Sequence, residues 1–117
     1  MQEGRRFLRN GPLKSVLGKF SAIVGLAPDF AEGWHKRVEI HYRMGNFQDS
    51  IKDLEMTVSL EPRHYGALAA LGLIYLNQGD ERAALEELEE ALRVNPHLPG
   101  TRSKIEELKE KLDGKKI

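Results

Sequence analysis

The chain contains no cysteine among its 117 residues. Disulfide bonds, thiol nucleophiles and cysteine-ligated zinc are therefore excluded, and the redox state of the compartment leaves no trace in the sequence. No apolar run approaches the roughly 18 residues of a membrane-spanning helix, and the amino-terminal segment lacks the apolar core of a signal peptide. We expect a soluble protein whose localisation is unknown. The cytoplasm is the default, and an exported compartment stays open if a signal was removed.

The chain also lacks a net charge, because 18 Lys and Arg residues balance 18 Asp and Glu residues. A nucleic-acid partner would need a basic stripe, so none is expected. The charges are nevertheless unevenly placed. The first unit is basic, with Arg5, Arg6, Arg9, Lys14 and Lys19. The last repeat helix is acidic, with Asp80, Glu81, Glu86, Glu87, Glu89 and Glu90. These residues are either solvated helix faces, or charged ends that attract each other head to tail or steer a partner.

Glycine and proline recur at one fixed interval. Gly11, Gly45 and Gly79 lie 34 residues apart, and so do Pro28, Pro62 and Pro96. Glycine suits the left-handed residue that ends a helix, and proline suits the start of the next helix. A period of this length predicts stacked helix-turn-helix repeats with a groove rather than a catalytic pocket.

Other residues keep the same register. The columns include Phe20 with Leu54 and Leu88, Val16 with Ser50 and Ala84, and Phe7 with His41 and Tyr75. Within one unit these positions recur every three or four residues, the period of a helix face. We predict helices at about residues 1–10, 13–26, 30–44, 47–60, 64–78 and 81–94.

These columns resemble the tetratricopeptide repeat (TPR). The second unit carries the resemblance in Trp34, Tyr42, Gly45, Phe47, Ile51, Leu54 and Pro62, and the third in Leu71, Gly72, Tyr75, Gly79, Ala84, Leu88, Ala91 and Pro96. The resemblance implies an all-α fold, an α-solenoid of about three TPR helix-turn-helix units with the first one truncated, and a concave face that binds other proteins. We predict a single domain over residues 1–117. It comprises a truncated repeat at 1–29, repeats at 30–63 and 64–98, a capping helix at 99–113 and a tail at 114–117.

The first unit departs from the family pattern. Residues 1–10 look like a first helix without its opening turn, which predicts a fragment of a longer protein or a trimmed chain. Gly4 lies in the small-residue position that Val38 and Gly72 occupy in the later units. Arg37 stands where the third unit has Leu71, and Glu3 is the equivalent residue one unit earlier. Either Glu3 and Arg37 form a pair, or each side chain reaches water.

The segment Thr101 to Leu112 has one narrow apolar stripe, formed by Ile105, Leu108 and Leu112, between charged and polar residues. The stripe predicts an amphipathic helix. A repeat stack leaves the last apolar side uncovered, so we interpret this helix as a cap. Its mixed charges do not favour a membrane-surface helix. Residues 114–117 should form a frayed tail.

Catalytic and metal-binding patterns are weak. His35 and Glu39 lie one turn apart, but no further ligand joins them at metal-binding spacing. His41 belongs to the ring column and should be packed, whereas His64 and His97 should face solvent. We expect no enzyme, no cofactor and no metal.

The candidate site is the concave groove, lined by the first helix of each unit. Its predicted peptide-binding residues are Arg5, Leu8, Arg9, His35, Lys36, Glu39, Tyr42, Arg43, Ala69, Ala70, Leu73, Leu76 and Asn77. Leu8, Tyr42 and Leu76 form an apolar row, and Arg9, Arg43 and Asn77 form a polar row. These rows predict an unknown protein or peptide partner with apolar and acidic side chains. The alternative is a scaffold that self-associates, or packs on the rest of a larger protein, through the same apolar strip.

One known use of the family is tested by residue identity. TPR proteins that clamp the acidic tails of heat-shock chaperones carry Lys, Asn and Arg at set positions. The matching positions here are Met1, Arg5, Lys36, Gly66 and Ala70. One unit along they are His35, Glu39, Ala70, Gly100 and Lys104. Both sets lack the asparagines and most of the cations, so the sequence does not predict this clamp.

Overall fold

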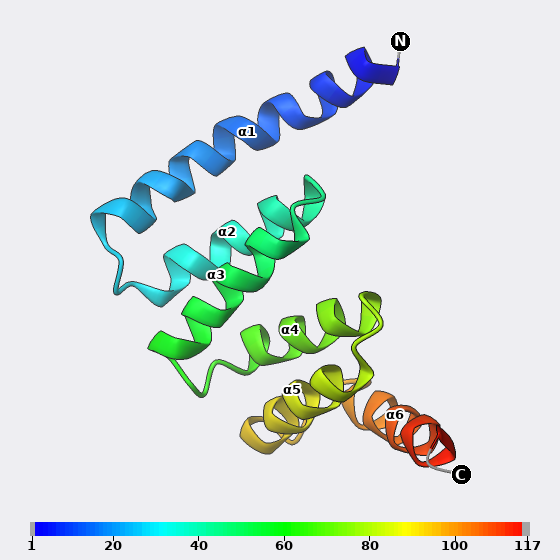
Figure 1. The fold of residues 1–117 in the computed structure, drawn as a ribbon. Coiled ribbons are helices and arrows are strands. Elements are labelled where there is room, and N and C mark those ends of the chain that lie inside the picture. Colours follow the sequence, from blue (N-terminus) through cyan, green and yellow to red (C-terminus); the bar gives the residue numbers. More distant parts are fainter. Residues whose placement is uncertain (1, 116–117) are drawn as a thin grey trace. The chain divides into compact units, whose positions relative to one another are not determined.

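The computed structural model describes the backbone of residues 2–115 and the side chains of residues 11–114. Over these residues every regular element is an α-helix, as predicted (Figure 1). The helices are α1 (Gln2–Leu26), α2 (Ala31–Arg43), α3 (Phe47–Leu60), α4 (Tyr65–Asn77), α5 (Glu81–Val94) and α6 (Thr101–Lys115). Their contacts divide the chain into two compact units, the first ending at Leu60 and the second beginning at Glu61.

The first unit packs α2 against both α1 and α3. Its buried apolar residues include Val24 of α1, Val38 of α2 and Leu54 of α3. Two buried hydroxyl groups are satisfied locally, because Ser50 Oγ donates to the carbonyl of Val38 at 3.1 Å and Thr57 Oγ1 to that of Asp53 at 2.7 Å. Small side chains at these positions let the two helices of the repeat approach closely.

Two glycine turns close the helical pairs in the same way. Gly45 and Gly79 adopt positive φ angles of 80° and 84°. The residue after each glycine donates its backbone N–H five residues back, Asn46 to His41 at 2.8 Å and Asp80 to Tyr75 at 2.9 Å. This bond, with the one made by the glycine N–H itself, defines the Schellman motif and satisfies carbonyls at the helix end.

The second unit packs α5 between α4 and α6. Gly72 of α4 faces Leu88 of α5 so closely that a Cβ atom there would lie 2.7 Å from the leucine side chain. Ile105 and Leu108 of α6 join Ala84 and Leu88 in one buried cluster. The predicted carboxy-terminal helix therefore covers the apolar side of α5. It also runs to Lys115 and so extends into the predicted tail.

Ion pairs flank the apolar contact between α5 and α6. Lys111 Nζ lies 2.9 Å from Glu81 Oε2, and Lys109 Nζ lies 3.5 Å from Glu89 Oε2. Glu90 pairs with Arg93 within α5. The acidic face of α5 is therefore partly matched inside its own unit, and the mostly buried Glu81 is not part of a solvated face.

The prediction of two helices at residues 1–10 and 13–26 is wrong, because α1 is one continuous helix with Pro12 inside it. Gly11 does not adopt the positive φ of Gly45 and Gly79. Proline is the physical reason that the turn differs, since Pro12 has no N–H to donate where Asn46 and Asp80 donate theirs. Inside a helix, proline also removes a hydrogen bond, at a cost of about 3 kcal/mol.

Within the described residues, no helix combines the length and the apolar character that crossing a bilayer requires.

Candidate interaction surface

The outer side of α2 carries the predicted groove residues of the first unit, which we call the α2 surface: His35, Lys36, Glu39, Tyr42 and Arg43. Lys36, Glu39, Tyr42 and Arg43 are exposed, whereas Val38 and His41 on the other side of the helix are buried. Tyr42 is 42% exposed. Its ring meets that of Phe47 edge to face, with centroids 5.2 Å apart, which restricts its orientation. The α2 surface therefore presents one large aromatic side chain to solvent.

Two polar pairs lie on or beside the α2 surface. Arg43 lies 3.1 Å from Glu39 Oε1, and His35 Nδ1 lies 3.8 Å from Glu32 Oε1. Exposed pairs of this kind contribute about 0–1 kcal/mol, so a partner can exchange them at little cost.

The outer side of α4 carries the predicted groove residues of the second unit, the α4 surface: Ala69, Ala70, Leu73, Leu76 and Asn77. Leu73 is 50% exposed, and the two alanines are half-buried. Leu76 has a second role, because it packs against the cluster formed by Ala84, Leu88, Ile105 and Leu108. Leu73 is therefore the main apolar side chain that the α4 surface offers to solvent.

These observations do not establish the two residue rows that the sequence predicts across the groove. The side chains of Arg5, Leu8 and Arg9 lie outside the described residues. The remaining members, Tyr42 with Leu76 and Arg43 with Asn77, come from different units, and each unit is described by itself. The groove as a continuous surface stays a prediction.

A polar network beneath the α2 surface joins the three helices of the first unit. Arg37 donates from Nε and one Nη to the two carboxylate oxygens of Asp53, at 2.7 and 2.8 Å. Its other Nη donates to Ser21 Oγ on α1 at 3.2 Å, and its guanidinium carbon lies 5.3 Å from the ring centroid of Trp34. The indole N–H in turn donates to the carbonyl of Pro28 at 2.8 Å. Arg37 thus connects α1, α2 and α3.

Sequence reasoning missed Asp53, and the interpretation in which Arg37 reaches water is wrong, because its fork is bonded to a carboxylate that is only 4% exposed. The side chain of Glu3, the other partner considered for Arg37, lies outside the described residues. The hydrogen bond to Asp53 raises the pKa of Arg37, and this outweighs the opposite effect of burial. The available signal was the acidic residue beside Leu54 on the buried side of α3.

Histidine positions agree with the sequence in two cases. His41 is buried as predicted, with Nε2 3.7 Å from Asp53 Oδ2 and Nδ1 3.5 Å from the Asn46 side chain. His97 is exposed as predicted. His64, expected in solvent, instead accepts the backbone N–H of Ala67 at 3.1 Å and caps the start of α4.

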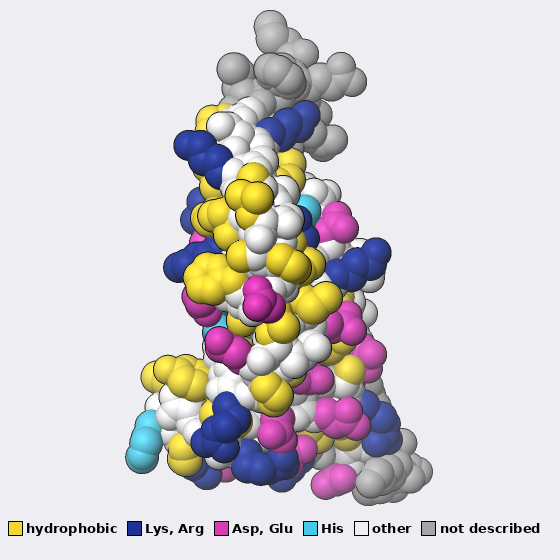
Figure 2. Space-filling view, turned by 90° about the vertical axis from the view of Figure 1, so that its left-hand side faces the viewer, with side chains coloured by type: hydrophobic (Ala, Val, Ile, Leu, Met, Phe, Trp, Pro, Cys, Tyr) yellow, Lys and Arg dark blue, Asp and Glu magenta, His cyan; other side chains and the backbone are white. Residues whose placement is uncertain are grey.

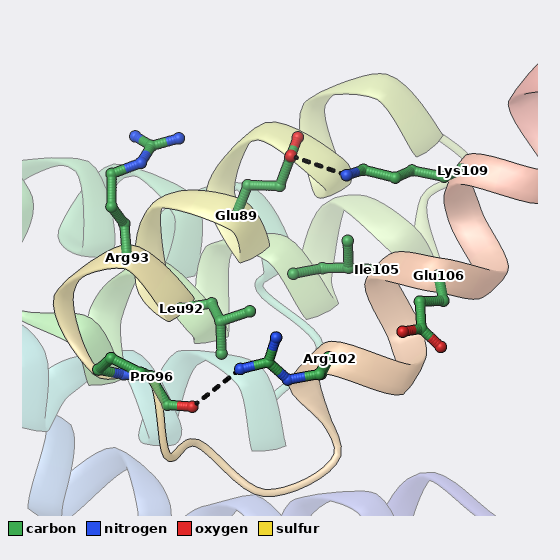
Figure 3. Close-up of a pocket in the computed structure, with 8 residues that line it drawn as sticks. All are labelled: Glu89, Leu92, Arg93, Pro96, Arg102, Ile105, Glu106 and Lys109. Carbon is green, nitrogen blue, oxygen red and sulfur yellow. Dashed lines mark hydrogen bonds and ion pairs between the residues drawn. The ribbon is translucent and has the colours of Figure 1, made fainter.

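A shallow hollow of about 420 Å³ lies between the end of α5 and α6 (Figure 3). Leu92, Pro96 and Ile105 form its apolar part. The figure shows Arg102 reaching back to the carbonyl of Pro96, at 3.5 Å, and Lys109 reaching across to Glu89. Lys109 thus links α6 to α5, whereas Arg102 links α6 to the loop that precedes it.

The fold and these surfaces define the class of protein. Antiparallel helix pairs, closed by equivalent glycine turns at a 34-residue spacing, make a helical-repeat protein. The chain belongs to the tetratricopeptide repeat family, and residues 65–98 match the family model described as "Tetratricopeptide repeat".

Relatives by sequence agree. The chain is 34% identical over 100 residues to a TPR repeat-containing protein of Rhizobium etli, covering 86% of this chain and 49% of that protein. It is 32% identical over 87 residues to the peroxisomal targeting signal receptor of Komagataella phaffii, covering 74% of this chain and 15% of the receptor. The chain thus spans about half or less of the length of these relatives.

Solved structures share the fold at low identity. The first TPR of Spaghetti (RPAP3), bound to the HSP90 peptide SRMEEVD, superposes with a TM-score of 0.79 at 14% identity, covering 96% of this chain and 89% of that one. The Yersinia enterocolitica type III secretion chaperone SycD, in complex with a peptide of the translocator YopD, gives 0.78 at 15% identity, covering 90% and 86%.

Proposed function

We propose that the chain is a non-enzymatic interaction module that binds a peptide or protein segment through the α2 and α4 surfaces. The observation that carries the proposal is the exposure of Tyr42, a large aromatic on the outer side of a helix whose other side is buried. Tyrosine and arginine anchors supply a large share of the energy of protein interfaces. Two of the solved structures with this fold hold peptides, which supports the same class of function.

The chemistry of the two surfaces suggests the kind of segment. Tyr42 and Leu73 offer apolar contact, and Arg43 and Lys36 offer positive charge on the α2 surface. Because the pair of Arg43 with Glu39 is exposed, an acidic side chain of the partner can replace Glu39. A segment with apolar and acidic side chains therefore fits best.

The experiment begins with selection of binding peptides from a random library on the full chain. Affinities of the selected peptides are then measured for Tyr42→Ala and Leu73→Ala. We expect Tyr42→Ala to weaken binding by about 1–3 kcal/mol, roughly 5- to 150-fold, with unchanged helical content. Met56→Ala is the matched control, since Met56 is a similarly exposed apolar residue on α3 rather than α2. Equal effects of all three variants would refute the site.

Arg43→Glu and the HSP90 peptide SRMEEVD refine this test. Arg43→Glu should lower the association rate and weaken the salt dependence of binding. It should change the dissociation rate less. The HSP90 peptide should not bind measurably, because the clamp positions here hold residues such as Gly66 and Ala70. Tight binding of that peptide would overturn the residue-by-residue comparison.

A second candidate function is self-association, or packing on a further part of a longer protein, through the apolar residues of the α4 surface. It is favoured by the exposure of Leu73 among Ala69 and Ala70. In that case Leu73→Glu should lower the molar mass measured by light scattering after size exclusion, and library selection should yield no specific peptide.

A further inference from the structure

The first unit leaves one helix face incompletely covered. In α3 and α5, three matching positions are fully or nearly fully buried: Ser50, Leu54 and Thr57, and Ala84, Leu88 and Ala91. The equivalent residues 34 positions earlier are Val16, Phe20 and Ile23 of α1, which we call the α1 face. Val16 and Phe20 are only half-buried, and Ile23 is 38% exposed.

Further apolar side chains are exposed next to the α1 face. Leu26 at the end of α1 is 88% exposed, and Phe30 before α2 is also exposed. Figure 2 shows hydrophobic side chains gathered on the upper half of this view, around the end of α1 and the start of α2. Contiguous exposed apolar side chains mark an interaction surface.

The chain itself carries a segment that fits this face. Residues 2–10 have the pattern of a first repeat helix, with Gly4 in the small-residue position of Val38 and Gly72, and Phe7 in the ring column of His41 and Tyr75. In the structure these residues continue α1 in a straight line (Figure 1). A straight helix carries them away from its own later turns, so they do not cover the α1 face of their own chain.

Local chemistry explains why residues 2–10 do not fold back onto α1. The turns at Gly45 and Gly79 are closed by the N–H groups of Asn46 and Asp80, and Asp80 also caps the next helix through Ala83 N–H. Pro12 holds the same position and supplies neither bond. Proline also weakens a straight helix, so local geometry strongly favours neither the straight helix nor the form with residues 2–10 folded back. Contacts that cover the α1 face therefore decide between the two forms.

We propose that the α1 face is covered by residues 2–10 of a second copy of this chain. Two α1 helices lying antiparallel would each place residues 2–10 on the α1 face of the other. The contacts are those that a folded-back first helix would make, but they need no turn at Gly11 and Pro12. The contact is the same in both directions, as in a two-fold symmetric dimer formed by exchange of a helix.

Light scattering after size exclusion, on the full chain at about 100 μM, tests the proposal. The wild type should have twice the monomer mass. Gly11→Ala should keep the dimer, because alanine disfavours the left-handed turn that folding back residues 2–10 requires. Inserting Gly-Ser-Gly between Gly11 and Pro12 should give a monomer, because a longer hinge lets residues 2–10 fold onto their own α1 face.

A second pair of variants locates the contact. Ile23→Glu, on the α1 face, should raise the dimer dissociation constant at least about tenfold. Met56→Glu, at a similarly exposed apolar residue of α3, should leave it unchanged, with circular dichroism confirming equal helical content. A monomeric wild type would overturn the proposal. So would a dimer that survives both Ile23→Glu and the insertion, or one that only Leu73→Glu breaks.

Discussion

Single residues give repeats that share the same sequence pattern different packing chemistry. Where the third repeat has Leu71, the second has Arg37, and its charge is matched by Asp53 on the buried side of α3. Removing one partner of a buried ion pair costs more than replacing both, because the remaining charge stays unpaired away from water. The pair therefore sets how the helices of the first unit fit together.

Asp53→Leu should accordingly destabilise the protein by about 3–5 kcal/mol, because it leaves the Arg37 guanidinium without its carboxylate. Adding Arg37→Leu, the residue type of the third repeat, should recover much of the loss. Urea unfolding followed by circular dichroism measures both free energies. If the two losses simply add, the pair is not coupled as the geometry indicates.

Two helical glycines give a matched comparison at the same scale. Gly72→Ala should destabilise by about 1–3 kcal/mol, because the new Cβ would lie 2.7 Å from Leu88 and overpack the second unit. Gly18→Ala should instead stabilise by about 0.5–1 kcal/mol, since nothing lies within 4 Å and alanine favours a helix. The difference in melting temperature between the variants reports the packing at Gly72. Equal shifts would contradict it.

Among the elements, α6 differs most from its neighbours. Within the described residues no second helix follows it to form a pair, yet it buries Ile105, Leu108 and Leu112 and adds two ion pairs to α5. Without α6, the apolar side of α5 that contacts it would meet water. The helix therefore supplies to α5 what a following repeat would supply.

Ending the chain after Gly100 should lower the melting temperature by about 5 °C or more and reduce solubility, because it uncovers that apolar side. Ending it after Asp113 is the matched control, since it keeps all three buried residues of α6. We expect thermal unfolding of the control to match the full chain. A chain ended after Gly100 that melts like the control and stays monomeric would show that α6 contributes no cover.

Across the whole molecule the net charge is zero, but the charged residues are unevenly distributed. Helix α1 carries Arg5, Arg6, Arg9, Lys14 and Lys19 against the single acid Glu3, whereas the acids of α5 are partly matched by α6. Two copies joined through α1 bring like charges together. Two copies joined head to tail would bring opposite charges together.

Ionic strength separates these arrangements. If the copies join through α1, raising salt from about 50 mM to about 500 mM should strengthen the dimer several-fold, because screening reduces the repulsion. The dissociation constant is measured by sedimentation equilibrium across this range. A dimer that weakens with salt would instead indicate the head-to-tail contact of basic and acidic ends.

The repeat register predicted α2 to α5 to within a residue at each end, because glycine turns and apolar columns act locally. It predicted α6 from one apolar stripe. It wrongly predicted a turn at Gly11 and Pro12, because Pro12 matches the register but lacks the N–H group that closes the turns at Gly45 and Gly79. It also failed at Arg37, whose partner lies 16 residues away on another helix. The exposed positions of Tyr42 and Leu73 followed from helix periodicity, but binding depends on a partner that periodicity does not describe.

The bond between Arg37 and Asp53 also limits how far these repeats are interchangeable. A chimera that replaces α3 with a copy of α5 would set Glu87, the residue in register with Asp53, opposite Arg37, with a side chain one methylene longer. Replacing α2 with a copy of α4 would set Leu71 opposite Asp53 and leave the carboxylate without its arginine partner. Helices can be exchanged between the two repeats only as complete pairs, so recombination within a repeat is restricted although recombination between repeats is not.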